Sequence, residues 1–367
     1  MGIRYERDSR RDTNGPLIFF SIMKDEAFEE EIRSAFISGL SFYAYRFPGD
    51  SMMCYGSSEG YVEGIGVPGF SIGFFAPDKP FITIPYDGIK RKEETQSFYT
   101  MPSDSTSYES YSREVKEIIA ALKEGKGDKV VASRVIVMDK DFDIADKFYE
   151  LSQRFPEAFV FCFSTPATGC WIGASPELLL EGKENEFKTM ALAGTRRAFS
   201  EERPWDEKNI EEQRIVSDYI CEKLAQHGMN AVIKETYTKT TGEIEHICTP
   251  ISAKFQLNDT KNGNMTLEKL LRDMSPTPAL CGSPKEFALT EIKNLENFDR
   301  GCYGGFCGPF HSIGDFTFHV VLRCASVNER SYCVYAGGGI TDRSEVSSEW
   351  HETAMKASNT FGISEII

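Results

Sequence analysis

Strand-like and helical segments follow one another in blocks along this 367-residue chain, and this order is the strongest constraint on its fold. Short apolar runs at 17–22, 42–47, 69–75 and 81–85 are separated by glycines and prolines, as in antiparallel sheets. Apolar periodicity predicts helices at about 112–124, 207–226 and 347–361, and a strand at 129–138. Regular βαβ alternation is not seen. The pattern therefore predicts an α+β fold with large, mainly antiparallel sheets rather than a doubly wound fold.

The charge balance disfavours several classes of function. The formal net charge is −15, so there is no excess of Lys and Arg to neutralise nucleic-acid phosphates. The N-terminus is charged, and no apolar run approaches the roughly 20 residues that a membrane span needs. We therefore expect neither nucleic-acid nor membrane partners. If the substrate is an anion, a local group of cations or a divalent metal has to reverse the sign of the charge inside the site.

The ten cysteines are scattered singly, without a CxxC motif or the spacing of a zinc site. Several of them lie within apolar, strand-like runs. Buried, reduced thiols are the simplest interpretation, and they are typical of a reducing compartment. We therefore expect a cytoplasmic protein.

Residues 64–69 match the GxGxxG pattern of dinucleotide-binding proteins, but their context does not fit such a site. Pro68 lies inside the motif, and the segment behind it is strand-like rather than a helix whose N-terminus could bind a pyrophosphate. The motif is interpreted as a turn. Residues 92–112 are polar, with Ser, Thr, Tyr and Glu predominating, and they are the best linker candidate in the chain.

Four short motifs follow one another in the last third of the chain. They are Ser275-Pro276-Thr277-Pro278-Ala279-Leu280-Cys281-Gly282, Leu322-Arg323-Cys324-Ala325, Tyr335-Ala336-Gly337-Gly338-Gly339-Ile340 and Glu349-Trp350-His351-Glu352-Thr353. Their order and spacing resemble those of the chorismate-utilising enzymes, most closely the isochorismate synthases. The resemblance implies two β-sheets packed face to face with helices outside, as in anthranilate synthase component I. It also implies one chorismate-binding domain over residues 1–367, in which 1–105 match loosely and 106–367 form the catalytic region.

Two residues carry the expected acid–base chemistry. Read alone, Lys129 at the start of a strand is a solvated residue, and Glu177 is a carboxylate in a loop or at a strand edge. The resemblance implies instead that Lys129 is the general base that activates water. It implies that Glu177 is the general acid that protonates the departing hydroxyl, a role that requires a raised pKa.

Three glutamates are implied as the Mg²⁺ site. Glu212 follows an acidic first helical turn that the helix dipole would favour anyway, but it lies at the edge of the apolar stripe and can point inward. Local reasoning treats Glu352 and Lys356 as a solvated i,i+4 pair. The resemblance assigns Glu212 and Glu352 as metal ligands, Glu349 as a supporting carboxylate and Lys356 as a partner of a substrate carboxylate. Oxygen ligands of this kind suit Mg²⁺.

The remaining expected residues bind the substrate. Read alone, Arg323 could be an ordinary exposed residue and the glycine run a plain turn. The resemblance implies that Arg323 grips a carboxylate through its planar guanidinium and that the Gly337 backbone lies close to an anion. The resemblance places Ala193, Gly194, Thr195, Ala279 and Leu280 on the pocket wall. His246 matches a histidine-containing strand of the family, but a single histidine is more often structural. Ser275, Gly338 and Asn209 depart from the pattern of close relatives, which bears on the fine positioning of the substrate.

The resemblance therefore implies a Mg²⁺-dependent isochorismate synthase that adds water at C2 of chorismate and removes the C4 hydroxyl. Lys129 argues against anthranilate synthase, and Ala193 argues against aminodeoxychorismate synthase. Salicylate synthase remains the main alternative, because it adds pyruvate elimination to the same first step. A non-catalytic member of the family is a less favoured alternative. We expect no glutamine amidotransferase subunit and a monomer or weak dimer. The product could enter menaquinone or siderophore biosynthesis.

Overall fold

The computed structural model describes residues 24–88, 97–198, 203–255 and 260–363, and its strands form two antiparallel sheets. The first sheet runs β14 (Gly282–Ser283), β6 (Lys129–Asp139), β18 (Ser331–Ile340), β17 (Cys324–Val327), β8 (Gly169–Ser175), β7 (Phe159–Thr165), β1 (Ser41–Arg46) and β2 (Cys54–Ser58). The second runs β11 (Ala231–Ile233), β13 (Ile244–Lys254), β10 (Glu186–Arg197), β9 (Leu178–Lys183), β16 (Asp315–Val320), β15 (Phe306–Ser312), β4 (Gly69–Gly73), β5 (Ile82–Pro85) and β3 (Val62–Glu63). A short strand, β12 (Tyr237–Thr241), also pairs with β13. The expected α+β fold is confirmed.

The two sheets pack face to face through a core that is rich in aromatic side chains. Tyr43 of β1 stacks on Phe70 of β4, with ring centroids 5.5 Å apart and planes at 5°. Phe159 of β7 stacks in the same way on His319 of β16 at 4.2 Å. Because β1 and β2 lie in the first sheet while β3, β4 and β5 lie in the second, the N-terminal part of the chain contributes to both layers.

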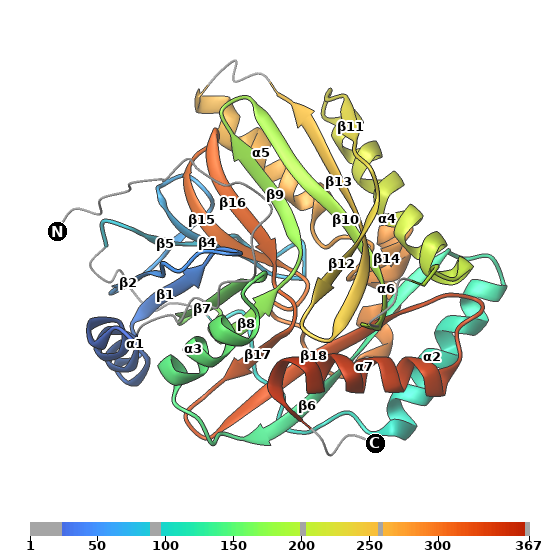
Figure 1. Ribbon diagram of the computed structural model, residues 1–367, viewed down its shortest axis with the longest axis horizontal. Helices are drawn as coiled ribbons and strands as arrows, with labels where there is room; N and C mark the ends of the chain where they lie inside the picture. The colour runs from blue at the N-terminus through green and yellow to red at the C-terminus, as the bar shows by residue number, and fades with distance from the viewer. Residues whose placement is uncertain (1–23, 89–96, 199–202, 256–259, 364–367) are drawn as a thin grey trace.

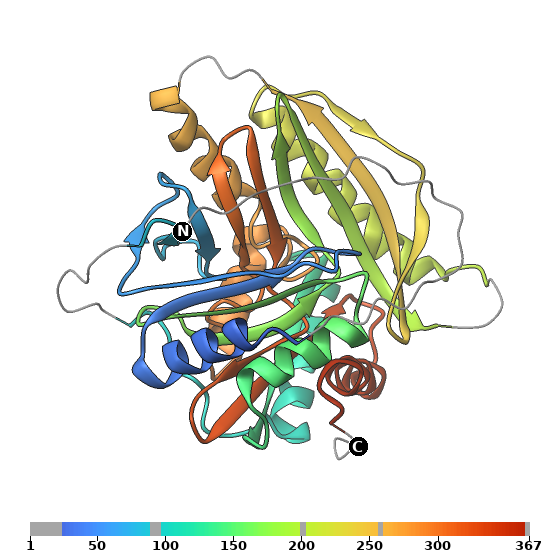
Figure 2. The ribbon, with the colours of Figure 1, turned by 60° about the vertical axis from the view of Figure 1, so that its left-hand side comes forward.

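Helices cover the outer surfaces of this sandwich (Figure 1). The helices are α1 (Glu26–Ser38), α2 (Tyr108–Lys123), α3 (Ile144–Arg154), α4 (Glu207–Gln226), α5 (Thr260–Met274), α6 (Lys285–Leu295) and α7 (Val346–Phe361). Helices α1, α3 and α7 pack on the outer face of the first sheet, whereas α4 lies along β10 of the second (Figure 2). None of the helices in the described part of the chain is both long and apolar enough to span a membrane.

Most of the expected elements are present, with two differences. The helix expected from about 112 starts at Tyr108, because the Ser107 side chain caps it by accepting from the Ser110 N–H at 3.2 Å. The linker prediction is wrong where the structure describes it: Tyr99 is buried against Trp171, and its hydroxyl bonds to Ser326. The run expected at 17–22 and residues 89–96 lie outside the described residues.

Candidate active site

A pocket of about 590 Å³, part of it open to solvent, lies where strands of both sheets approach α4 and α7. Most of the side chains expected at the site line it: Glu177, Ala193, Gly194, Thr195, Glu212, His246, Ala279, Leu280, Arg323, Gly337 and Lys356. Lys129 and Glu352 each form an ion pair with a lining residue, and Glu349 lies one helical turn before Glu352. Segments that are far apart in the sequence therefore meet at one place.

The glycine run at 337–339 forms part of the pocket wall, and it is strand rather than turn. It belongs to β18, and each of its residues pairs with a residue of β6. A Cβ at Gly339 would overlap the Glu212 carboxylate and lie 2.6 Å from Lys129 Cε. A Cβ at Gly337 would lie 2.8 Å from Ser133 Oγ. Glycine is needed here because side chains from other elements cross directly over the strand.

Lys129 opens β6 and is completely buried rather than solvated. Its Nζ donates to Glu212 Oε1 at 2.7 Å. Burial alone raises the pKa of the Glu212 carboxyl, but Lys129, Lys208 and Lys356 outweigh this effect, so the pKa is lowered overall. The local interpretation of Lys129 as a solvated residue is therefore wrong, because its side chain points inward to Glu212 on α4.

Glu177 lies between β8 and β9 and is almost completely buried. Its N–H donates to Ser175 Oγ at 3.3 Å and its carbonyl accepts from the Val320 N–H at 3.0 Å, so the backbone around it is held on both sides. Burial raises the pKa of Glu177 to about 8, although Lys129 and Lys239 act in the opposite direction. A carboxyl group with this pKa keeps its proton at neutral pH, as a general acid requires.

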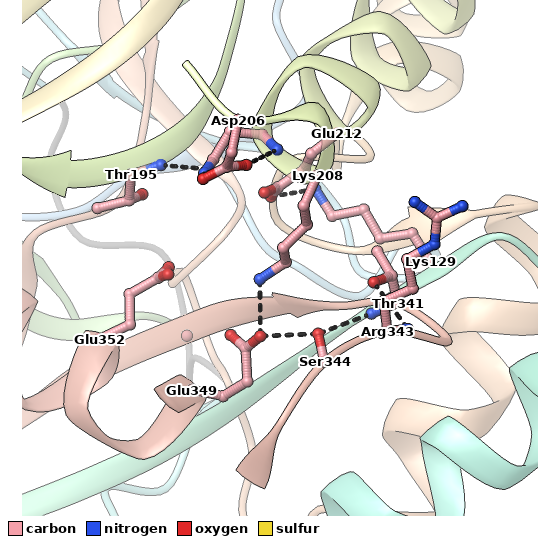
Figure 3. Close-up of polar contacts among 12 residues, drawn as sticks. Lys129, Thr195, Asp206, Lys208, Glu212, Thr341, Arg343, Ser344, Glu349 and Glu352 are labelled. Atoms are coloured by element: carbon pink, nitrogen blue, oxygen red, sulfur yellow. Dashed lines mark hydrogen bonds and ion pairs between the residues drawn. The ribbon is translucent and has the colours of Figure 1, made fainter. Parts of the chain in front are cut away.

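The face of α7 that appears polar in the sequence turns toward the pocket (Figure 3). Glu352 accepts from Lys356 Nζ at 2.7 Å, as an i,i+4 pair does, but Lys356 lines the pocket and also donates to the Gly337 carbonyl. The Glu349 side chain is only 2% exposed and accepts from Lys208 Nζ and Ser344 Oγ, each at 2.7 Å. Burial, followed by the neighbouring Glu352, raises the pKa of Glu349.

Three carboxylates gather beside β18, yet in the described residues no three acidic, His or Cys side chains are placed to hold a metal as they stand. Each carboxylate is turned toward a lysine instead. Two observations nevertheless fit a divalent cation. Glu349 Oε2 is buried without a hydrogen-bond partner, and a Cβ at Gly338 would lie 3.0 Å from it and 3.8 Å from Glu352 Oε1. Both α7 carboxylates thus face one glycine, and oxygen ligands of this kind suit Mg²⁺.

His246 orients Arg323. Burial lowers the pKa of His246 well below its ordinary value, so its imidazole is neutral, and its Nδ1 lies 2.7 Å from the Gly194 carbonyl. Nδ1 must then donate, which leaves Nε2 to accept from Arg323 Nη2 at 3.1 Å. Arg323 directly precedes β17 and has a positive φ of 50°, a backbone conformation that non-glycine residues rarely adopt. The unusual backbone conformation of Arg323 and its hydrogen bond to His246 together fix the position of its side chain.

Asn209 holds an irregularity in β10 against the start of α4. The pairing of β10 with β13 shifts register between Ala193 and Arg196, and Gly194 has a φ of 71°. The freed Thr195 N–H donates to Asn209 Oδ1 at 3.1 Å, while Asn209 Nδ2 donates to Asp206 Oδ2 at 2.8 Å. This departure from the family pattern therefore shapes the pocket wall through the backbone.

Sequence reasoning missed two half-buried lysines near the site. Lys208 precedes Glu212 by four residues on α4, so helical spacing alone could have placed both on one face. Lys239 lies on β12 and donates to the Pro176 carbonyl at 2.7 Å, directly before Glu177. No local signal in the sequence indicates that contact, because it joins strands that are far apart in the chain.

Comparison with known proteins gives consistent matches. A family model described as chorismate binding enzyme matches residues 85–361. The isochorismate synthase EntC of Escherichia coli K12 is 33% identical over 251 residues, and the vibriobactin-specific isochorismate synthase of Vibrio cholerae is 29% identical over 266 residues. These alignments cover 64% and 69% of this chain, but 63% and 66% of the relatives, slightly less than two thirds of their length.

A solved structure shares the fold over most of its length. It is the crystal structure of DhbC from Bacillus anthracis. The TM-score is 0.74 at 22% sequence identity, and the alignment covers 91% of this chain and 98% of the other. The two-sheet architecture is therefore common to both proteins.

Proposed function

The chain belongs to the chorismate-binding enzyme family, and on this premise we propose that it is a Mg²⁺-dependent isochorismate synthase. In the proposed reaction water adds at C2 of chorismate, the ring double bonds shift, and the C4 hydroxyl leaves as water. The elements of water gained at C2 are lost at C4, so the net reaction is an isomerisation. The relatives with this activity in their names support the proposal.

The observation that carries the proposal is the burial of Glu177 in the wall of the pocket. A carboxyl group on the pocket wall that is protonated at neutral pH can donate that proton to a departing hydroxyl. Lys129 is close enough to influence the pKa of Glu177, and it would take the proton from the attacking water. A pair of groups with different environments and opposite tasks is typical of acid–base catalysis.

Charge in the pocket supports a substrate that carries two carboxylates. Arg323 and Lys356 line the pocket and would hold the pyruvyl carboxylate, while the guanidinium offers the planar, two-pronged geometry that carboxylates accept. Glu212 and Glu352 would hold Mg²⁺ with Glu349 in support, and the bound ion would supply the positive charge that fixes the ring carboxylate. These positive groups would make the site locally positive, although the chain as a whole carries a net charge of −15.

Two further features of the proposal follow from the chemistry. Because water is the nucleophile, the enzyme would need no glutamine amidotransferase partner to deliver ammonia.

The ten cysteines are free thiols, eight of them buried, which supports a reducing compartment.

Incubation with chorismate and Mg²⁺, followed by NMR, tests the proposal. We expect isochorismate to accumulate with at most minor pyruvate, and added isochorismate to return to chorismate, because one acid–base pair serves both directions. Stoichiometric salicylate and pyruvate would indicate a salicylate synthase instead. Anthranilate formed with ammonia, or no turnover at all, would overturn the proposal in favour of another family activity or a non-catalytic protein.

A further inference from the structure

Three lysines neutralise the three carboxylates of the proposed metal site, one for each. Lys129 pairs with Glu212, Lys208 with Glu349 and Lys356 with Glu352, and each ion pair measures 2.7 Å. The charges in this part of the pocket therefore balance without any metal. A divalent cation that binds here adds two positive charges close to three amines, so it competes with the lysines for the carboxylates.

Lys208 is the least firmly held of the three. The Lys129 side chain is completely buried under α4, and Lys356 has a second acceptor in the Gly337 carbonyl. The Lys208 side chain is 30% exposed, and among the described residues Glu349 is its one hydrogen-bond acceptor. Its flexible four-carbon stem can swing toward solvent without disturbing a strand.

The position of Lys208 near the start of α4 also indicates that its charge interacts with groups outside the helix. It is the second residue of α4, where the helix dipole disfavours a positive charge. The compensation comes from across the pocket, since Lys208 reaches from α4 to Glu349 on α7 (Figure 3). Burial lowers the pKa of Lys208, but Glu349, Glu352 and Glu212 together raise it above its ordinary value, so all three carboxylates act on this one amine.

We propose that Lys208 is a built-in counter-cation, which occupies the carboxylate cluster in the metal-free enzyme and has to leave it when the divalent cation binds. This inference rests on the metal site proposed above. Glu349 Oε1 accepts from Lys208 and Ser344, whereas Oε2 has no hydrogen-bond partner and is available to a metal ion. A buried carboxylate with no cation nearby would be costly, and Lys208 removes that cost until the metal arrives.

The proposal predicts opposite effects of two substitutions on metal affinity. Lys208→Met keeps the aliphatic stem but removes the competing charge, so the dissociation constant for Mg²⁺ or Mn²⁺ should fall about tenfold, equivalent to ~1.4 kcal/mol. Lys208→Arg offers a two-pronged guanidinium to Glu349 and should weaken metal binding. Isothermal titration of the full-length protein without substrate measures both constants.

The matched control is Lys223→Met, which makes the same charge change in the last turn of the same helix. At 1.5 Å per residue it lies roughly 22 Å along the axis from Lys208. It should leave the metal dissociation constant unchanged. An unchanged or higher constant in Lys208→Met would overturn the inference, and no metal binding by the wild-type protein would overturn the proposed metal site as well.

A measurement on the wild-type protein keeps the test independent of how the variants fold. Acetylation by acetic anhydride, read by mass spectrometry, reports the exposure of each lysine amine. Lys208 should be acetylated faster in saturating Mg²⁺ than in EDTA, because the amine then faces solvent, whereas Lys223 should react equally in both. Equal or slower reaction of Lys208 with Mg²⁺ would overturn the inference.

Discussion

Lys129 Nζ donates to Glu212 Oε1 at 2.7 Å, and this contact joins the proposed base to a proposed metal ligand. A lysine acts as a base through the lone pair of its nitrogen, and the same nitrogen can keep donating an N–H to the carboxylate, which then fixes the position of the base. Lys129 on β6 and Glu212 on α4 are therefore coupled, so a substitution of either residue should change the properties of the other.

Replacement of Lys129 tests this link. Lys129→Gln should lower isochorismate formation by about 10²–10⁴-fold, the usual scale of general-base catalysis. In metal-free buffer it should also lower the free energy of unfolding, by roughly 3 kcal/mol, because Glu212 loses its partner. The double variant Lys129→Gln/Glu212→Gln should recover stability but not activity, as denaturant unfolding and turnover assays would show. Near-normal isochorismate formation by Lys129→Gln would remove it as the base.

The pKa of Glu177 predicts how activity and stability depend on pH. Glu177 is an acid only when protonated, so kcat/KM should fall as pH rises above about 8. The folded pKa is raised above the ordinary 4.5, so folding binds a proton between these values. The stabilisation from Glu177 is then complete below pH 4.5 and is lost as pH rises through about 8.

Glu177→Gln separates these effects from those of other groups. The variant should be inactive, and the difference in Tm between it and the wild-type protein should change with pH in the window just given. A Tm difference that stays constant from pH 4.5 to 9 would contradict the raised pKa.

Mg²⁺ dependence should follow Glu212 and Glu352. EDTA should abolish turnover, and each single Glu→Gln change should weaken Mg²⁺ binding by about tenfold or more, since even supporting residues of metal sites contribute that much. Glu211→Gln is the matched control, because it adjoins Glu212 but is exposed and pairs with Arg214. Activity that survives exhaustive chelation would show that the proposed metal site is wrong.

Arg323→Lys should raise KM with a smaller change in kcat. Lysine keeps the charge but lacks the planar fork, and the contact with a carboxylate exists in both ground and transition states. Arg330→Lys, at an exposed position, should change neither constant. Steady-state kinetics with chorismate measures both variants, and an unchanged KM in Arg323→Lys would exclude this contact with the substrate.

Local patterns were sufficient for much of the fold, whereas the residues of the site were predicted from the family resemblance. Helix α4 has the bounds expected from its apolar periodicity, and β6 and α7 are displaced by one residue at most. Helix α2 was expected four residues too late, because its cap depends on a single serine hydroxyl that periodicity does not report. The motifs identified many of the residues that line the pocket, since the resemblance compares positions and does not require knowledge of contacts.

The sequence by itself determined the α+β class with mainly antiparallel sheets and the i,i+4 contact of Glu352 with Lys356, because each depends on residue type and on spacing along the chain. The acid–base roles of Lys129 and Glu177 came from the family resemblance and remain proposals. Only the tertiary structure decided that Glu349 is buried, that His246 holds Arg323, and that Lys208 reaches across to α7. The reason is physical: these contacts join elements far apart in the chain. The packing of α4 and α7 beside β18 places their polar faces over the pocket instead of in solvent.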